Sequence, residues 1–117
     1  MFSGLRPKPP PGLWTFSTKM FIFLLKASLK ENCQKRYVRF CTREFRQRIY
    51  EHIGYARTKN ITKATGEHFN LPGHSTSDMK FTIIEKVKSL DPLYGREREK
   101  YHIRKFNTFY KGINRTT

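Results

Sequence analysis

The chain has 117 residues, with 24 Lys and Arg against 9 Asp and Glu, which gives a formal net charge of +15. This length suits one domain, and the charge favours a polyanionic partner such as nucleic acid. Aromatic residues make up 15% of the chain, which excludes a disordered basic tail because such a tail lacks the apolar material for a core.

Cysteine content and apolar runs indicate where such a chain would act. Cys33 and Cys41 are too few for a disulfide framework, so we expect an intracellular reducing compartment, nuclear or cytoplasmic. The longest apolar run, residues 20–25, has six residues, whereas a membrane-spanning helix needs roughly 20. We therefore expect no membrane partner.

The N-terminal residues differ from the rest of the chain. Prolines at positions 7, 9, 10 and 11 predict an extended polyproline arm over residues 1–19. The domain itself is expected over residues 20–115.

Three segments have the composition of β-strands. Residues 20–25 (MFIFLL) and 36–40 (RYVRF) are rich in β-branched and aromatic side chains. The connection between them is short, which favours an antiparallel hairpin. Residues 79–87 alternate between apolar and polar side chains, which predicts a third strand. We predict an α/β fold with a small three-stranded, mostly antiparallel sheet flanked by helices.

A first helix is predicted from about Arg43 to residue 57 or 58, with Thr42 as its N-cap. Arg48 and His52 are four residues apart and therefore lie on one face. With Tyr37 at the end of the preceding strand they would converge on one phosphate. The alternative interpretation is an ordinary basic amphipathic helix. The apolar stripe that this helix should bury is Phe45, Ile49, Ile53 and Ala56.

The last helix is predicted to begin at Asp91 and Pro92, a good cap followed by a good first residue, and to end near residue 106. Glu99 falls in line with the apolar side chains of this helix. It is either a rim carboxylate paired with an arginine or a ligand for a hard divalent cation, which prefers oxygen. The apolar residues of that stripe are Ile103, Phe106 and Tyr110.

The order of these motifs resembles the GIY-YIG endonucleases, in the form carried by Penelope-like retroelements. The resemblance covers about residues 20–115, and residues 66–75 (GEHFNLPGHS) resemble the signature of the retroelement subfamily. Tyr37-Val38-Arg39 match the family's YIG motif, and Arg48 and His52 match the arginine and histidine of its first helix. Glu99 matches its metal-binding glutamate, and Asn114 matches its terminal asparagine.

The resemblance implies nicking of double-stranded DNA by a monomeric domain with one Mg²⁺ or Mn²⁺ ion, held by Glu99. Arg48 would meet the charge that develops on the phosphorane. Tyr37 would position or activate water, or act as nucleophile or base, and His52 would assist proton transfer. These four residues should face one concave surface. The basic side chains expected to grip the DNA backbone without reading sequence are Arg43, Arg46, Arg57 and Lys59.

Two positions depart from the family's pattern. Phe23 stands where the first-strand motif has a tyrosine, and phenylalanine has no hydroxyl to bond water. Arg39 replaces the glycine of YIG and adds bulk beside Tyr37. These changes predict weak or absent nicking. Two hypotheses remain, a weakened endonuclease and a noncatalytic basic nucleic-acid-binding module on the same fold.

The retroelement subfamily also implies a zinc site with two cysteines and two histidines. Cys33, His68 and His74 match three of these ligands, whereas Ala27 stands at the position of the other cysteine. Structural zinc takes four ligands, so Cys41 is a candidate replacement. Alternatively, the two histidines are hydrogen-bonded loop residues.

Overall fold

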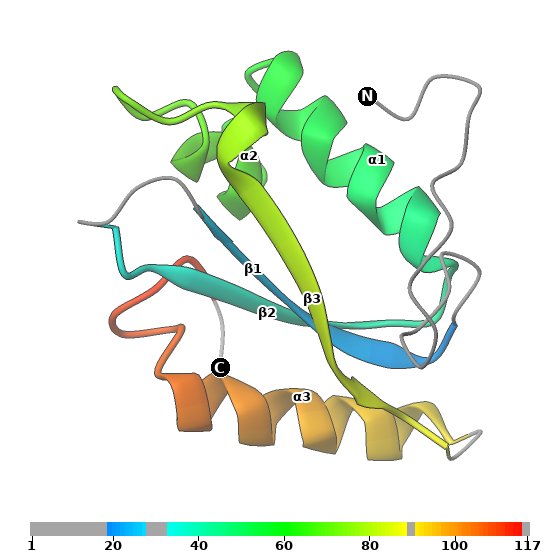
Figure 1. Ribbon diagram of the computed structural model, residues 1–117. Helices are drawn as coiled ribbons and strands as arrows, with labels where there is room; N and C mark the ends of the chain where they lie inside the picture. Colours follow the sequence, from blue (N-terminus) through cyan, green and yellow to red (C-terminus); the bar gives the residue numbers. More distant parts are fainter. Residues whose placement is uncertain (1–18, 28–32, 89–90, 116–117) are drawn as a thin grey trace.

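A three-stranded antiparallel sheet with strand order β2-β1-β3 forms the centre of the computed structural model, which describes residues 19–27, 33–88 and 91–115. Helix α1 covers one face of the sheet and α3 covers the other (Figure 1). This arrangement confirms the predicted α/β fold. The elements in chain order are β1 (Phe21–Ala27), β2 (Arg36–Cys41), α1 (Phe45–Arg57), α2 (Ala64–His68), a 3-10 turn (Thr76–Asp78), β3 (Met79–Lys86) and α3 (Pro92–Phe106).

The central strand β1 explains the apolar run in the sequence, because helices cover both of its faces. Phe21, Phe23 and Leu25 point into the core beneath α1, whereas Ile22 and Leu24 point into the core beneath α3. β1 pairs with β2 as the predicted antiparallel hairpin. The Pro-rich arm expected over residues 1–19 lies outside the described residues, except for Lys19.

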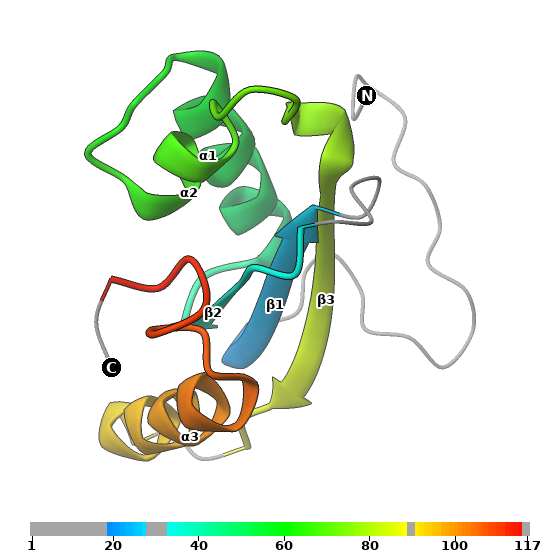
Figure 2. The same ribbon diagram turned by 90° about the vertical axis from the view of Figure 1, so that its left-hand side faces the viewer.

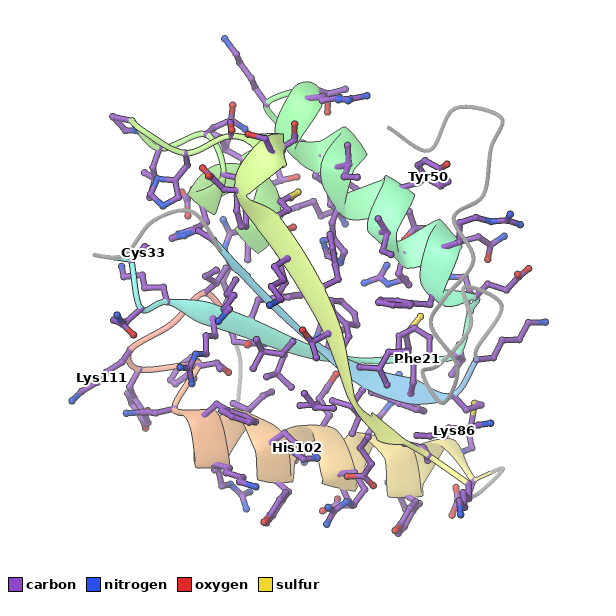
Figure 3. The ribbon with its side chains drawn as sticks, viewed as in Figure 1. Phe21, Cys33, Tyr50, Lys86, His102 and Lys111 are labelled. Atoms are coloured by element: carbon purple, nitrogen blue, oxygen red, sulfur yellow. The ribbon has the colours of Figure 1, made fainter. Side chains whose placement is uncertain are left out.

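Helix α1 buries the predicted stripe of four apolar residues. Phe21 lies beneath its first turn, with its ring centroid 5.2 Å from that of Phe45 (Figure 3). The predicted start was wrong: Glu44 is the N-cap, and no side chain caps the helix. The Cys41 thiol accepts a hydrogen bond from the Arg43 amide and donates one to the Arg43 carbonyl, both at 3.3 Å, so residues 41–43 form a turn instead.

Helix α3 begins as predicted, since the Asp91 carboxylate accepts a hydrogen bond from the Leu93 amide at 3.0 Å and Pro92 follows the cap. It ends at Phe106 because Asn107 adopts a left-handed conformation. Tyr110 therefore leaves the predicted stripe and is 80% exposed, which corrects that assignment. Among the described residues, no helix is long and apolar enough to cross a membrane.

Two glycines let α3 and the C-terminal segment approach β2 closely. A Cβ atom on Gly95 would lie 2.2 Å from the Phe40 ring, and one on Gly112 would lie 2.6 Å from the Arg36 carbonyl oxygen. Glu99 lies one turn after Gly95 and Asn114 two residues after Gly112, so both side chains reach the outer edge of β2. Figure 2 shows the C-terminal segment alongside this strand.

Candidate functional site

A pocket of about 400 Å³ opens where β2, α1, α2 and the C-terminal segment meet. Its walls carry five basic side chains, and none of the described carboxylates is part of its lining. Neutral polar groups and rings complete the walls, among them Tyr55, Thr62 and Thr65. The pocket is therefore suited to an anion. The basic side chains are Arg39, Arg43, Arg48, Lys63 and Arg115.

The structure brings most of the predicted catalytic residues to this pocket. Tyr37, Arg48, His52 and Asn114 line it. Glu99 does not, because its carboxylate accepts a hydrogen bond from the backbone amide of Phe40 at 2.7 Å, on the outer edge of β2. The shared concave surface expected for four residues thus includes three of them, with Glu99 outside it.

Arg48 and His52 form a fixed pair, as their spacing predicts. The His52 Nε2 atom lies 3.2 Å from Arg48 Nη2, and Nδ1 lies 2.6 Å from the Thr65 hydroxyl. Because a guanidinium only donates, Nε2 accepts and Nδ1 carries the proton. Burial, followed by the positive charge of Arg48, lowers the pKa of His52 to about 3. His52 is therefore neutral at physiological pH, and it orients Arg48.

Tyr37 lies at the base of the pocket and is 6% exposed. Burial raises the pKa of its phenol, and the nearby charges of Arg39 and Arg48 oppose that rise only in part. The hydroxyl is therefore protonated at neutral pH and acts as a hydrogen-bond donor. The Arg39 guanidinium lies over the Tyr37 ring, 5.8 Å from its centroid.

Phe23 lies beside two of the pocket residues. Its ring centroid is 6.2 Å from that of Tyr37 and 5.6 Å from that of His52. The side chain is fully buried and is not part of the pocket wall. A phenyl ring without a hydroxyl thus stands next to both polar rings.

The residues around Glu99 do not fit a divalent cation. One of its oxygens already accepts the Phe40 amide, and the Arg39 guanidinium lies 4.0 Å from that same oxygen. Among the described residues, Glu99 belongs to no group of three or more potential metal ligands. A positive charge beside a carboxylate opposes the binding of a second cation there.

The basic residues of the pocket are mostly not those predicted to contact DNA. Arg43 lines it, whereas Arg46, Arg57 and Lys59 do not. Sequence reasoning missed Lys63 and Arg115, which come from segments without helical or strand periodicity. The one available signal was their charge, which they share with much of the chain.

A cluster of potential metal ligands lies near the N-terminal end of β2. Cys33, His68 and His74 each offer one ligand atom, and these atoms all lie within 4.8 Å of one another. Cys33 lies just before β2 (Figure 3). The buried Nε2 atom of His74 has no hydrogen-bond partner among the residues that the structure describes. Burial, followed by the neighbouring His74, lowers the pKa of His68 to about 4. Imidazole nitrogens and a cysteine sulfur in this arrangement could hold a metal ion.

Neither Cys41 nor Ala27 supplies a fourth ligand to this cluster. Cys41 bonds the Arg43 backbone and is not part of the cluster. Ala27 ends β1 opposite Met79, buried in the core. Among the described residues, no fourth side chain joins this cluster.

We expect His52 to make the protein less stable in acid. Unfolded His52 takes up a proton near its ordinary pKa of 6.5, whereas the folded residue does so only near 3. Between these values the unfolded state binds more protons, so the free energy of unfolding must fall as the pH drops from about 6.5. Urea denaturation between pH 7.5 and 4.5 should show this fall, and His52→Asn should reduce it to the part that His68 contributes, since the pKa of His68 is also lowered, to about 4. An equal slope in the variant would contradict the assignment.

Comparisons with known protein families, curated proteins and solved structures find no match for this chain.

Proposed function

We propose that this chain is a monomeric GIY-YIG-like domain that binds the backbone of double-stranded DNA and nicks one strand weakly or not at all. The observation that carries the proposal is the convergence of Tyr37 from β2 with Arg48 and His52 from α1 on one pocket with basic walls. A lining with cationic and neutral polar side chains is what a phosphate group requires.

Arg48, Tyr37 and His52 each have a chemical role that fits a bound phosphodiester. Arg48 is only 12% exposed in its side chain and is held by Glu51 and His52, so it is oriented to meet negative charge on a phosphate oxygen. The Tyr37 hydroxyl donates to a second oxygen or orients a water. His52 accepts a proton only when Arg48 turns away, because the Nε2 lone pair is already engaged.

The surroundings of Glu99 favour weak activity. The resemblance implies Mg²⁺ or Mn²⁺ at this residue, but a guanidinium and a backbone amide already meet its carboxylate. We therefore assign no step of the reaction to a cation. The same observation supports the second candidate function, a noncatalytic nucleic-acid-binding module on this fold. Detectable nicking of supercoiled plasmid with Mg²⁺ or Mn²⁺ would favour the weakened endonuclease, and its absence would favour the noncatalytic module.

Binding to duplex DNA should depend steeply on salt and little on sequence. Five basic side chains at the pocket would release about five counterions, so the affinity should fall about 100-fold or more between 50 and 200 mM salt. Fluorescence anisotropy with two unrelated duplexes measures both properties.

The matched variants for this titration are Arg48→Gln and Arg104→Gln. Arg104 is exposed on α3, on the opposite face of the sheet from α1. Arg48→Gln should weaken binding and reduce the salt slope, whereas Arg104→Gln should change both less. An affinity independent of salt would refute this mode of binding.

We also propose that the ion held by Cys33, His68 and His74 is Zn²⁺, since thiolate and imidazole together suit zinc. Adding Zn²⁺ to metal-free protein should raise the melting temperature, by the equivalent of about 2.7 kcal/mol at 100 times the dissociation constant. Cys33→Ala should abolish this shift, and Cys41→Ala, which removes a thiol outside the cluster, should keep it. Metal analysis of protein purified without chelator provides the second measurement. An unchanged melting temperature with Zn²⁺, or a shift lost in Cys41→Ala, would rule out this site.

A further inference from the structure

The pocket holds more positive charge than its neighbouring carboxylates balance. Arg43 and Arg48 share the single carboxylate of Glu51. Arg115 pairs with Glu67 at 3.1 Å. With Glu99 beside Arg39, three carboxylates therefore face the five basic side chains of the pocket. Within the described part of the chain, the basic side chains of the pocket therefore keep a net excess of two positive charges.

Arg39 and Lys63 are the two basic side chains of the pocket that form no hydrogen-bonded ion pair with a described carboxylate. The carboxylate nearest to Arg39 lies 4.0 Å away, beyond hydrogen-bonding distance, and the arginine side chain is 40% exposed. Lys63 lies 5.5 Å from the centroid of the Tyr55 ring, and among the described residues no carboxylate lies within 4.0 Å of its ammonium group. Both side chains are therefore available to a ligand in the pocket.

We propose that this pocket binds a phosphate monoester dianion, the terminal phosphate of a nucleic-acid strand, without a divalent cation. A monoester carries close to two negative charges at pH 7, which match the two unbalanced positive charges, whereas an internal phosphodiester carries one. The Arg39 guanidinium stands beside Glu99 and supplies the positive charge there. This inference rests on the proposed binding of nucleic acid at the same pocket.

The test is a binding measurement in EDTA with one single-stranded oligonucleotide in three forms: with a 5′-phosphate, with a 3′-phosphate, and with hydroxyls at both ends. At least one phosphorylated form should bind about tenfold or more tightly than the hydroxyl form, since charge-assisted hydrogen bonds are the strong ones. Inorganic phosphate should compete for the same site. Equal affinity for all three forms, or a preference that needs Mg²⁺, would overturn the proposal.

Two further measurements keep the test specific. The preference should decline below about pH 6, because the monoester takes up a proton there. His52, with its pKa of about 3, does not titrate in this range and so does not cause the decline. Arg39→Gln and, separately, Lys63→Gln should reduce the preference, whereas Arg104→Gln should keep it. A preference that persists in both pocket variants would overturn the assignment to this pocket.

The outcome is distinguishable from failure of the proposed function. Salt-dependent duplex binding without a preference for phosphorylated ends would overturn this inference alone. A preference for phosphorylated ends without duplex binding would overturn the duplex-binding function alone.

Discussion

Asn114→Ala should lower the free energy of unfolding by about 2–4 kcal/mol, because it leaves two buried backbone groups without partners. The amide of Val38 donates to Asn114 Oδ1 at 2.8 Å, and Asn114 Nδ2 donates to the carbonyl of Val38 at 2.8 Å. The side chain is buried, so water does not readily replace it. Urea denaturation at pH 7 measures the change, which is a large share of the stability of a small domain.

This prediction assigns Asn114 a structural role at the edge of β2. Beside it, the Ile113 amide donates to the Arg36 carbonyl at 2.8 Å and Glu99 accepts from the Phe40 amide, so the outward-facing groups of the strand are paired. Asn114→Asp should also destabilise, because a carboxylate has no donor for the Val38 carbonyl. Lys111→Ala, an exposed change in the same segment (Figure 3), is the control. A loss below about 1 kcal/mol for Asn114→Ala would show that water caps the edge equally well.

The parts of the fold that the sequence predicts are those with a local pattern. The alternation over β3 and the stripe of α1 each follow from periodicity, and the cap of α3 follows from Asp91 and Pro92. Helix α2 was missed because five residues are too few to show a period. The predicted start of α1 was wrong because the turn before the helix depends on the Cys41 thiol, and cysteine is not part of a recognised capping pattern.

The candidate site was predictable only where its residues are close in the chain. Tyr37, Arg48 and His52 belong to β2 and the helix that follows it, so their approach to one another follows from that connection. The Thr65 hydroxyl and the Arg115 guanidinium arrive from other segments. The buried Glu99 carboxylate was expected to pair with a cation. It accepts a hydrogen bond from a backbone amide, which offsets most of the cost of burying the charge. Sequence alone does not show which edge of a sheet a helix will touch.

Phe23→Tyr combined with Arg39→Gly should raise metal-dependent nicking by about 100-fold to 1,000-fold, the usual cost of one missing catalytic hydrogen-bonding group. The tyrosine would add a hydroxyl beside Tyr37 and His52, whose rings already contact Phe23. The glycine would remove the guanidinium that lies 4.0 Å from the Glu99 carboxylate, which makes that carboxylate available to a cation. Conversion of supercoiled plasmid to nicked circle, with and without Mg²⁺, measures the gain.

The controls separate chemistry from a general change in charge. Adding Glu99→Gln to the double variant should abolish the gain while keeping an acceptor for the Phe40 amide, so a loss of activity would reflect the carboxylate charge rather than the strand edge. Lys80→Gly in place of Arg39→Gly removes one cation from an exposed position of β3 and should give no gain. Strong nicking by the unmodified chain would show that the missing hydroxyl is dispensable. If the double variant stays inactive yet keeps its fold, the defect lies outside these two positions, and the three-ligand cluster at Cys33 becomes the next place to examine.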